Sequence, residues 1–494
     1  MSTCTANETV ETKQGVLCPP VEAPQAWMDK AKARVADYHR FQELGLIAKH
    51  GDFFPSVHYP PITMYPRIQQ EALFKGFQMP ADGMLDVYAH LPFCNSHCVF
   101  CHYPVKTGEQ MDEKERYMAA FEKEMDLCLQ QLGLKQIKAR SVLVGGGTPT
   151  YLTIEQLTRF LKGFTQRVDV SHVPQFNYDV DPATLVGPEG RERLRIMREF
   201  GVNRLTIGVQ SLDDHVLKLM ARHHDAQTAI DSIKNCMEYG FTVNIEFIFG
   251  YPGETLENWM QIIQTAISTG VDEIQLYRLK IESYGDFQGP IKNLKDKNPD
   301  AVPSTETAFM MKQLAIELLN ANGYVENLRR VFSKKREIYS HYAHNQCCDQ
   351  HDQIGLGLTA FSSMHDRFAL NTQSFEEYYR LIDQGKLPLN RGYVRNHDEQ
   401  MRWAIVLPLK NRDIYKPRFT ELTGESLDKV FRPKIEKLKK YGLLRETASN
   451  LFLTDTGCFF ADEVVQQFHA PRFIPYPRSD YAEGPLNPYL DTQP

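Results

Sequence analysis

Short apolar runs alternate with longer amphipathic runs between about residues 84 and 280. The short runs are bounded by turn signals and rich in β-branched residues, which indicates buried strands. Strands are predicted at 84–91, 141–144, 175–180, 204–209, 242–249 and 273–277. Between them, helices are predicted at 112–132, 154–166, 189–200, 226–239 and 256–269. This alternation predicts an α/β fold with a parallel sheet and right-handed crossovers, in which six units favour a partial (β/α)6 barrel over a doubly wound open sheet.

The residues on either side of this region follow no single pattern. The first 80 residues carry several prolines and are interpreted as an N-terminal extension with one helix near 26–46. The barrel core is placed at 81–290. An accessory segment at 291–395 is expected to complete the substrate site. Its predicted elements are a helix near 306–320, a basic polar stretch at 329–336 and a glycine-rich strand at 354–358.

From 396 to 494 the pattern becomes mostly helical. Helices are expected near 399–406, 415–423 and 427–441, followed by a hairpin at 443–454. Helices that precede a small hairpin resemble a winged-helix domain. Charges of both signs are mixed here, which favours a packing or lid domain over a domain that binds DNA.

Composition narrows the class of protein. Apolar residues make up 42% of the 494 residues, which is enough for a sizeable core. Lys and Arg number 56 and Asp and Glu 62, and this net charge of −6 gives no electrostatic basis for nucleic-acid binding. No apolar run approaches the roughly 18 residues of a membrane span, and residues 1–8 lack a secretory signal pattern. We therefore expect a soluble cytoplasmic protein.

Three of the ten cysteines, Cys94, Cys98 and Cys101, fall within eight residues. Thiolates are soft ligands that select zinc, copper or iron–sulfur clusters. Structural zinc usually needs a second cysteine pair downstream, and the chain has no second Cys-x2-Cys pair. The spacing therefore favours a [4Fe–4S] cluster with one open iron, and zinc is the alternative. Candidates for a fourth zinc ligand are His97, His102, Cys347 and Cys348.

A second motif, Gly145-Gly146-Gly147-Thr148-Pro149-Thr150, follows the second predicted strand. Glycine lets the backbone approach a ligand closely. A tight strand–helix turn would use the same residues, so the motif alone leaves both interpretations open. It is not a dinucleotide fingerprint, because no Gly-x-Gly-x-x-Gly opens a helix here.

Taken together and in order, these motifs resemble the radical S-adenosylmethionine (SAM) superfamily. The triad is Cys-x3-Cys-x2-Cys with Phe100 before the last cysteine. Further stretches are similar to the oxygen-independent coproporphyrinogen III oxidase group, or HemN-like family. These stretches are Tyr88-Ala89-His90-Leu91-Pro92-Phe93-Cys94, Arg204-Leu205-Thr206-Ile207-Gly208-Val209-Gln210-Ser211 and Phe249-Gly250-Tyr251-Pro252-Gly253-Glu254-Thr255. The resemblance covers residues 85–362, more than half of the chain.

The resemblance implies a [4Fe–4S] cluster held by the three cysteines and a SAM molecule bound at its open iron. In the family, the reduced cluster cleaves SAM to a 5′-deoxyadenosyl radical that takes a hydrogen atom from the substrate. Tyr88 and Glu246 are expected at the reacting centre, and Phe100 near the adenine. The other expected SAM contacts are Gly146, Gly147, Thr148, Asp179, Gln210 and Arg222.

Four positions depart from the family pattern. The family's Glu-x-Asp-Pro reads Asp179-Val180-Asp181-Pro182 here, and Glu246 stands where the family has Asp. Both side chains still offer carboxylate acceptors. Tyr103 stands where the decarboxylases of the family carry a further cysteine. His344-Asn345 keeps only the start of the His-Asn-x-x-Tyr-Trp segment of the haem-chaperone branch.

These departures favour the methyl-transferring members of the family, which use two SAM molecules. We expect methyl or methylene transfer to a conjugated, anionic small molecule, with a tetrapyrrole such as haem or a porphyrin leading. The alternatives are an oxygen-independent coproporphyrinogen III oxidase and a haem chaperone. The second SAM or the substrate is expected near Gly355 and Gly357, with Arg329 and Arg330 pairing with its carboxylates. An electron donor such as flavodoxin or ferredoxin is implied, and a monomer is expected.

Overall fold

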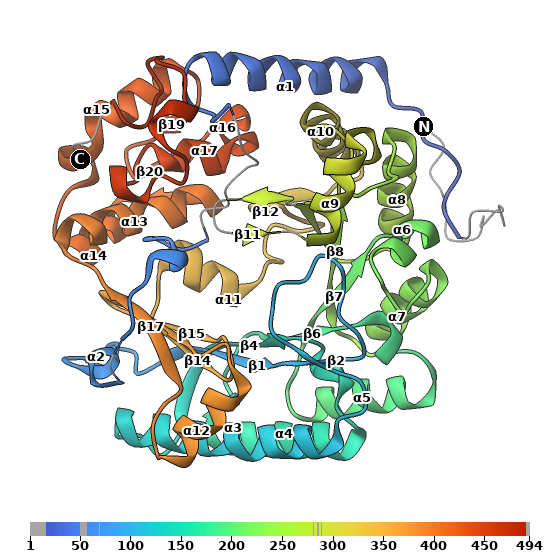
Figure 1. Ribbon diagram of the computed structural model, residues 1–494, viewed down its shortest axis with the longest axis vertical. Helices are drawn as coiled ribbons and strands as arrows, with labels where there is room; N and C mark the ends of the chain where they lie inside the picture. Colours follow the sequence, from blue (N-terminus) through green and yellow to red (C-terminus); the bar gives the residue numbers. More distant parts are fainter. Residues whose placement is uncertain are drawn as a thin grey trace.

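Six parallel strands form the centre of one large sheet (Figure 1). The structure is a computed structural model that describes residues 16–49, 57–68, 70–279, 281–283, 286–287 and 289–490. The parallel strands are β1 (Leu85–Leu91), β4 (Ile137–Gly146), β6 (Phe176–Val180), β7 (Arg204–Gln210), β8 (Thr242–Phe249) and β9 (Glu273–Arg278). They lie in the order β9-β8-β7-β6-β4-β1. All six predicted strands are therefore confirmed, in a partial barrel whose described strands leave two open edges.

Each pair of neighbouring parallel strands is joined by a helix packed on the outer face of the sheet. These are α3 (Met111–Leu132), α4 (Ile154–Arg167), α5 (Gly187–Glu199), α7 (Ala226–Glu238) and α8 (Leu256–Ser268), all at predicted places. In Figure 1 they follow one another along the bottom and the right-hand side of the sheet. Outward strand residues such as Val87 and Ile245 are fully buried in one core with helix residues such as Leu161 and Ile263. This burial of apolar surface is the main force that stabilises the barrel.

Both edges of the parallel sheet are extended by strands from the accessory segment. Beside β9 lie β13 (Val331–Ser333) and then β12 (Val325–Leu328), both antiparallel. Beside β1 lies β14 (Gln353–Leu356), which is parallel to it, followed by the antiparallel strands β15 (Phe361–Met364), β16 (Arg367–Asn371) and β17 (Leu389–Val394). The expected polar stretch at 329–336 is corrected, since Arg329 and Arg330 form the turn of the β12–β13 hairpin.

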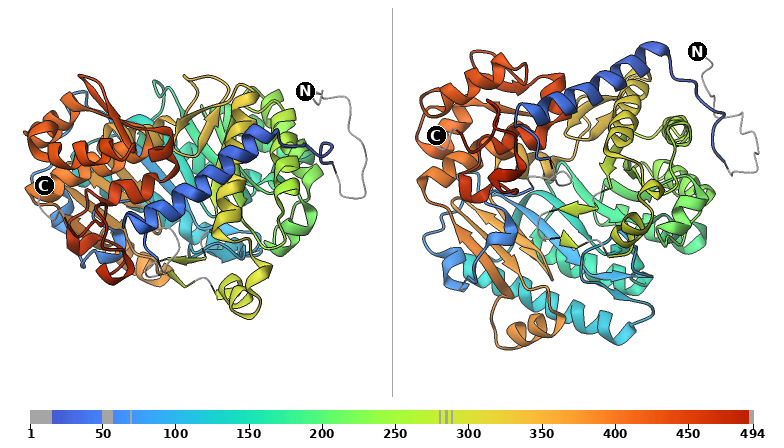
Figure 2. Two further views of the ribbon diagram at one scale, coloured as in Figure 1. Left: turned by 90° about the horizontal axis from the view of Figure 1, so that it is seen from above. Right: turned by 45° about the horizontal axis from the view of Figure 1, so that its top comes forward.

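The N-terminal helix lies across the top of the molecule in Figure 1. This helix, α1 (Gln25–Glu43), packs against α10 (Thr305–Ala321) and reaches the C-terminal region, as the two further views show (Figure 2). Arg34 connects the two parts, because it donates hydrogen bonds to Gln313 and to Thr456. The parts of the extension at 1–15 and 50–56 lie outside the described residues.

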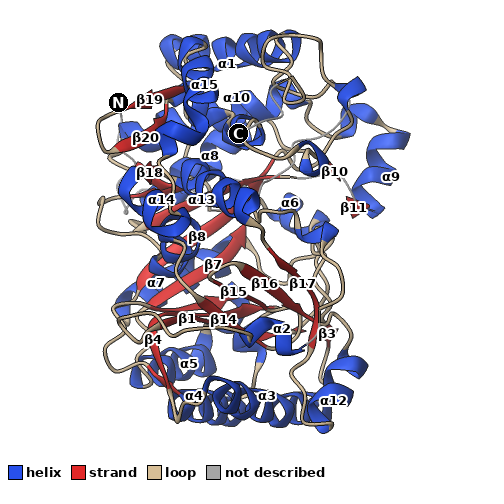
Figure 3. Ribbon diagram, turned by 90° about the vertical axis from the view of Figure 1, so that its left-hand side faces the viewer, coloured by secondary structure: helices blue, strands red, loops and turns tan. Residues whose placement is uncertain are grey.

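The C-terminal region is mostly helical and carries a small sheet (Figure 3). Helices α13 (His397–Asn411), α14 (Lys416–Thr423) and α15 (Leu427–Lys440) precede the hairpin β19 (Leu444–Glu446) and β20 (Asn450–Leu453), as predicted. A third strand, β18 (Asp413–Tyr415), pairs with β20 and completes the winged-helix-like arrangement. This strand was not predicted, because its three residues look in the sequence like an ordinary connection between two helices. Among the described residues, no helix is long and apolar enough to cross a membrane.

A candidate active site at the carboxyl ends of the strands

The inner face of the barrel is polar. Because side chains alternate across a strand, every second residue of the parallel strands points inward. A central contact is the buried ion pair between Arg204 of β7 and Glu273 of β9, with 2.6 Å between Nη2 and Oε2. Arg204 also donates to Asn177 at 2.6 Å. Buried charge is tolerated only when it is paired and hydrogen-bonded, so this network fixes the relative positions of β6, β7 and β9.

A cavity of about 920 Å³ opens above this network, at the carboxyl ends of the strands. Its lining brings together ten of the predicted site residues from five separate segments of the chain. These are Cys94, Cys98, Phe100, Cys101, Gly146, Gly147, Thr148, Asp179, Gln210 and Arg222. Glu246 of β8 lines it as well. The cavity thus brings together three thiols, two carboxyl groups, one guanidinium group and two glycines.

The three cysteines lie on the loop that follows β1. The start of this loop is fixed by two short strands, β2 (Phe93–Cys94) and β3 (Lys106–Thr107). Thr148 Oγ1 donates to Cys94 Sγ at 3.6 Å, and Arg222 Nη1 donates to Cys98 Sγ at 3.3 Å. Both sulfurs therefore already face hydrogen-bond donors that would stabilise a thiolate.

The arrangement of these thiols fits an iron–sulfur cluster better than a single ion. Burial raises the pKa of Cys94 to about 12, so the bare thiol keeps its proton and only a bound metal would remove it. Within the described ranges, no three His, Cys, Asp or Glu residues are close enough together to ligate one metal ion. The three thiolates of one cluster bind separate irons, so an iron–sulfur cluster does not require the sulfurs to converge on a single ion.

The glycines of the second motif allow close packing against the cysteine loop. A Cβ on Gly147 would lie 2.8 Å from Cys94 Sγ and 2.7 Å from the carbonyl oxygen of Phe93. Gly146 has a φ of 118°, a backbone conformation that residues with a side chain rarely adopt. A Cβ on Gly145 would lie 2.5 Å from Asp179 Oδ2. The motif is therefore both a tight turn and part of the cavity wall, so the two interpretations of the sequence are compatible.

Two buried carboxyl groups stand on neighbouring walls of the cavity. Burial, with a smaller contribution from the nearby Glu246, raises the pKa of Asp179 to about 8. Burial also raises the pKa of Glu246 to about 7, and a hydrogen bond from Tyr277 at 3.3 Å opposes that rise. The two groups thus carry less than two negative charges at neutral pH. A bound cationic group would restore both charges, because an opposite charge favours the ionised form.

Gln210 and Arg222 meet at the end of β7. Gln210 has a φ of 68°, where β7 departs from its register with β8, and this turns its side chain into the cavity. Arg222 Nη2 donates to Asp181 at 2.6 Å and to the carbonyl oxygen of Gly208 at 2.7 Å. Asp181 also lines the cavity, although the sequence interpretation gave it no role. The signal was its position two residues after Asp179.

Three predicted site residues lie elsewhere among the described positions. Tyr88 is not part of the cavity lining; its hydroxyl lies 3.0 Å from His90 Nδ1, and a Cβ on Gly145 would lie 3.4 Å from its ring. Gly355 on β14 packs against the backbone of Phe361. A Cβ on Gly357 would lie 2.6 Å from the carbonyl oxygen of His90. Neither glycine lines the cysteine cavity, and close backbone packing accounts for both, so the expectation that they face a second SAM or the substrate stays a prediction.

The cavity extends beyond the predicted residues toward α3 and α5. Lys114, Arg193, Tyr151 and Tyr103 line this end. Lys114 Nζ donates to the carbonyl oxygen of Tyr151 at 2.9 Å and lies 4.0 Å from the centre of the Tyr151 ring. Arg193 pairs with Glu189 at 3.2 Å. These cations, from different helices, were not found from the sequence because charged helix residues usually face solvent.

The fold and this cavity define a radical SAM protein. Residues 88–266 match the family model described as the radical SAM superfamily, and residues 396–460 match the model of the HemN C-terminal domain. Residues 88–266 thus carry a radical SAM domain and residues 396–460 a HemN C-terminal domain, and the two matches in this order support the HemN-like family. Proteins of this class bind a [4Fe–4S] cluster and SAM, and the thiols and glycine wall described above fit both.

Known relatives match over most of the chain. It is 27% identical to the heme chaperone HemW of Bacillus subtilis, over 78% of this chain and 99% of that protein. It is 24% identical to the oxygen-independent coproporphyrinogen III oxidase of Helicobacter pylori, over 87% of this chain and 96% of that protein. The solved structure of coproporphyrinogen III oxidase (HemN) from Escherichia coli superposes with a TM-score of 0.72 at 22% identity, covering 83% of this chain and 96% of that chain. That likeness establishes the shared fold.

Proposed function

We propose that this protein is a radical SAM enzyme that transfers a methyl or methylene group to a conjugated, anionic small molecule, with a tetrapyrrole as the leading substrate. The observation that carries the choice of reaction is Tyr103. It lines the cavity at the position where the decarboxylases carry a further cysteine, and its side chain is exposed. A phenol neither binds soft metals nor reacts as a thiol does, so that position serves a different reaction here.

In this proposal the protein holds the cofactors with residues already described. Cys94, Cys98 and Cys101 hold the cluster. Gly146, Gly147 and Thr148 accept the methionine end of SAM, and Phe100 packs beside its adenine. A reduced cluster held there, together with SAM, would supply the electron and the hydrogen-abstracting chemistry of the reaction.

The polar residues of the cavity orient SAM, and the positive charge of SAM favours ionised carboxyl groups around it. Asp179 and Glu246 accept hydrogen bonds from its ammonium and ribose hydroxyl groups, which favours their ionised forms. Gln210 and Arg222 donate to its carboxylate and ribose. Tyr88, hydrogen-bonded to His90, would act beside the reacting centre without lining this cavity. Holding SAM at several fixed points places its reacting bond close to the substrate.

The size of the cavity supports two bound molecules. Its volume of about 920 Å³ lies at the upper end of the range typical of ligand pockets, roughly 300–1,000 Å³. At one end, Lys114 and Arg193 offer two cations, and the carboxyl groups of Glu109, Glu155 and Glu189 also line the cavity. We assign this end to the anionic substrate or to a second SAM, in place of the region near Gly355 and Gly357.

A second candidate function is the oxidative decarboxylation of coproporphyrinogen III. It is favoured by the match to nearly the full length of the oxidase from Helicobacter pylori. The long match to the heme chaperone HemW makes haem binding a third candidate. All three functions concern a tetrapyrrole. They differ in what happens to the substrate, which an assay can determine.

The proposal includes an organisation and partners that match the family. Residues 81–290 form the radical SAM core, 291–395 the accessory segment and 396–494 the C-terminal domain, after an extension at 1–80. A small electron-transfer protein of the flavodoxin or ferredoxin class reduces the cluster, and the chain works as a monomer.

The deciding experiment is a mass-shift assay with SAM that carries a ¹³C-labelled methyl group. The reconstituted, reduced protein is incubated with haem, coproporphyrinogen III or a quinone. We expect a product that is heavier by one labelled carbon from a tetrapyrrole and not from a quinone. Unlabelled products that have lost carbon dioxide would support the decarboxylase instead, and unchanged tetrapyrrole held by the protein would support the chaperone.

A further inference from the structure

A chain of hydrogen bonds joins β8 and β9 and ends on a carboxyl group of the cysteine cavity. Asn244 Nδ2 donates to Gln275 Oε1 at 3.2 Å, and Gln275 Nε2 donates in turn to the hydroxyl of Tyr277. That hydroxyl donates to Glu246 Oε1 at 3.3 Å. Glu246 is a lining residue of the cavity, whereas the other three are not among its described lining residues. The chain therefore links residues outside the cavity lining to a carboxyl group inside it.

The direction of these bonds follows from the single proton of the tyrosine hydroxyl. A hydroxyl group carries one hydrogen and two lone pairs. Because Tyr277 accepts from Gln275, its own hydrogen is available for Glu246. A donor that faces a carboxyl group favours the ionised form of that group. Successive hydrogen bonds also polarise one another, which strengthens the last bond of the chain. Tyr277 is thus arranged to stabilise a negative charge on Glu246.

A cation lies over the ring of the same tyrosine. The guanidinium carbon of Arg330 is 5.3 Å from the centre of the Tyr277 ring. This is within the roughly 6 Å over which a cation and an aromatic ring attract one another. Burial raises the pKa of Tyr277 well above its usual value, so its hydroxyl keeps its proton, and the charge of Arg330 opposes that rise. Arg330 therefore makes the hydroxyl a stronger donor without removing its hydrogen.

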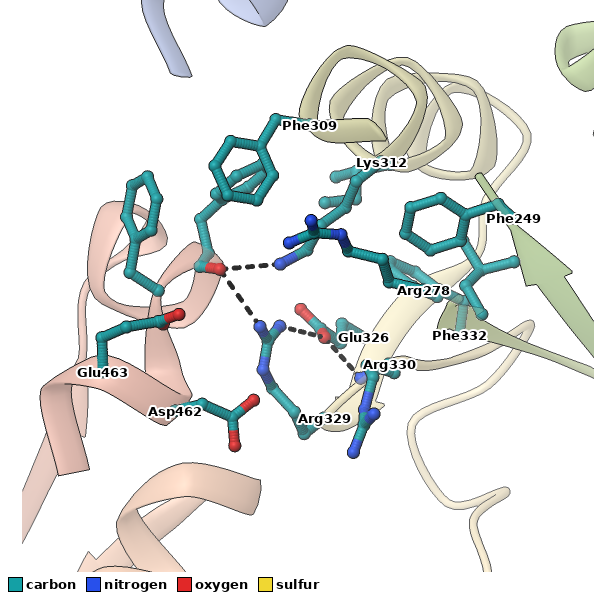
Figure 4. Close-up of a pocket in the computed structure, with 14 residues that line it drawn as sticks. Phe249, Arg278, Phe309, Lys312, Glu326, Arg329, Arg330, Phe332, Asp462 and Glu463 are labelled. Atoms are coloured by element: carbon teal, nitrogen blue, oxygen red, sulfur yellow. Dashed lines mark hydrogen bonds and ion pairs between the residues drawn. The ribbon is translucent and has the colours of Figure 1, made fainter. Parts of the chain in front are cut away.

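The backbone of Arg330 is held in an unusual conformation at the turn between β12 and β13 (Figure 4). Its φ is 71°, which residues with a side chain rarely adopt. Its N–H donates to Glu326 Oε1 at 2.7 Å, and its carbonyl oxygen accepts from the N–H of Leu276 at 3.0 Å. In Figure 4 its guanidinium points away from Lys312. Strain of this kind persists only where the surrounding structure holds it, so the position of the guanidinium is determined by the turn.

The same turn contacts the C-terminal region. It faces α16 (Asp455–Phe459) and α17 (Ala461–Gln466) across a small space (Figure 4). Arg329 Nη2 donates to the carbonyl oxygen of Phe459 at 3.3 Å, and the backbone N–H of Arg329 donates to that of Asn411 in α13 at 2.9 Å. The position of Arg330 therefore depends on the packing of the C-terminal region against the barrel.

Other charged groups face Glu246 from the neighbouring strands. Burial raises the pKa of Glu246 to about 7, and the hydrogen bond from Tyr277 is the largest opposing contribution, ahead of the charges of Arg204 and Arg222. Asp179 on β6 is a neighbouring acid, and its own pKa is raised to about 8, mainly by burial. The balance between charged and neutral Glu246 at neutral pH therefore depends strongly on the tyrosine hydroxyl.

We propose that Tyr277, supported by Arg330, is a positioning residue of the SAM site that holds Glu246 in its charged form. The sulfonium and ammonium groups of SAM are cationic, so they bind a carboxylate more tightly than a neutral acid. This inference rests on the proposed function only for the binding of SAM beside Glu246. It adds the groups that control the charge of that carboxyl, and it does not depend on what is transferred to the substrate.

Isothermal titration calorimetry of the cluster-loaded chain with SAM, at pH 7 and at pH 8.5, tests the proposal. Tyr277→Phe removes only the hydroxyl. The loss of one hydrogen bond to a charged group changes the proton affinity of that group by about tenfold. With Glu246 half-charged near pH 7 in the wild type, SAM binding should weaken about fivefold at pH 7 and less than about twofold at pH 8.5.

The matched control is Tyr324→Phe. The hydroxyl of Tyr324 is buried and donates at 2.6 Å to the carbonyl oxygen of Val271, which does not titrate. Any effect of this variant on SAM binding should therefore be the same at both pH values. If Tyr277→Phe does not fold, as judged by circular dichroism, Arg330→Met takes its place. It removes the cation over the ring, and we expect a loss of about twofold at pH 7 that disappears at pH 8.5.

Thermal unfolding without SAM provides a second readout. The melting temperature of Tyr277→Phe relative to the wild type should fall as pH rises from 6 to 8.5, because the lost bond matters most when Glu246 is charged. In a Glu246→Gln background no charge forms, so the same substitution should cause a constant difference.

Two results would overturn the proposal. One is a loss of SAM affinity in Tyr277→Phe that is the same at both pH values, as in the control. The other is a stability trend that persists in the Glu246→Gln background. Failure of the proposed reaction is distinguishable from either, because a chain that binds SAM as expected and forms other products would refute the transfer and leave this inference in place.

Discussion

The guanidinium of Arg222 lies 3.3 Å from the sulfur of Cys98, to which it donates a hydrogen bond. The same side chain is held by Asp181 and by the carbonyl oxygen of Gly208, so its position is fixed from both sides. A cation and an N–H donor beside a cluster sulfur stabilise the reduced, more negative cluster. In the proposed function, Arg222 would therefore influence the reduction of the cluster as well as the binding of SAM.

Replacing Arg222 by Gln should make the midpoint potential of the reconstituted cluster more negative. The expected shift is on the order of 50 mV, equivalent to about 1 kcal/mol for one charge-assisted hydrogen bond and a single electron. Potentiometric titration followed by electron paramagnetic resonance, without SAM, measures it. The control is Arg195→Gln on the exposed side of α5, where Arg195 pairs with Glu192. Equal potentials in Arg222→Gln and the wild type would show that the contact with Cys98 has no effect on the cluster.

Cluster loading should depend on the three cysteines of one loop. Replacement of Cys94, Cys98 and Cys101 together by Ala should abolish iron binding after anaerobic reconstitution, whereas the wild-type chain should hold about four irons, as a [4Fe–4S] cluster requires. Cys458→Ala, in the C-terminal region, is the control and should load fully. Iron and sulfide analysis gives the result. Full loading of the triple variant would place the cluster elsewhere.

Gly147→Ala should disturb the cysteine loop without replacing any of the three cysteines. The added Cβ would lie 2.7 Å from the carbonyl oxygen of Phe93, so the loop must shift, at a cost of about 1–3 kcal/mol. We expect a lower melting temperature and incomplete cluster loading. Gly163→Ala in α4 is the matched control, because its Cβ would have no neighbour closer than 3.6 Å and Ala favours a helix by about 1 kcal/mol. A Gly147 variant as stable and as fully loaded as Gly163→Ala would refute the packing argument.

The stability of the free protein should fall with rising pH because of Asp179 and Glu246. Burial raises the folded-state pKa of Asp179 to about 8 and that of Glu246 to about 7. Both values lie above those of the unfolded chain, so the folded state binds more protons between about pH 4 and 8. The stability that these carboxyl groups give when protonated is lost as pH rises through that range, at up to about 1.4 kcal/mol per pH unit for each group.

Asp179→Asn removes one of these groups while keeping its shape. The melting temperature of this variant relative to the wild type should therefore increase from pH 5 to pH 8. Asp126→Asn, on the exposed side of α3, should show no such trend. Thermal unfolding at several pH values provides the comparison. A constant difference across the range would mean that Asp179 titrates normally in the folded chain.

The barrel could be predicted because its strands and helices have distinct patterns. Buried runs such as 242–249 are framed by turn residues, and each helix between them presents one apolar face. The edge hairpin could not be predicted in the same way. Its strands are three and four residues long and are joined by Arg329 and Arg330, which in a sequence look like a solvated turn. Their burial depends on α17, which lies more than a hundred residues further along the chain.

The site could be predicted where motif position determines geometry. Residues that follow the carboxyl ends of parallel strands meet at one edge, which is why the cysteine loop, Asp179, Gln210 and Glu246 line one cavity. Gly355 and Gly357 show the limit of that reasoning. A glycine required by a neighbouring backbone and a glycine required by a ligand look the same in a sequence. Lys114 and Arg193 were missed because helix cations give no sign of the direction in which they point.

The reaction itself is tested most directly by counting the products of SAM. The reduced, reconstituted protein is incubated with a tetrapyrrole substrate, and S-adenosylhomocysteine, 5′-deoxyadenosine and carbon dioxide are quantified together. Methyl transfer predicts S-adenosylhomocysteine and 5′-deoxyadenosine in equal amounts, with no carbon dioxide. Release of carbon dioxide with 5′-deoxyadenosine and without S-adenosylhomocysteine would contradict the proposed transfer and identify a decarboxylase.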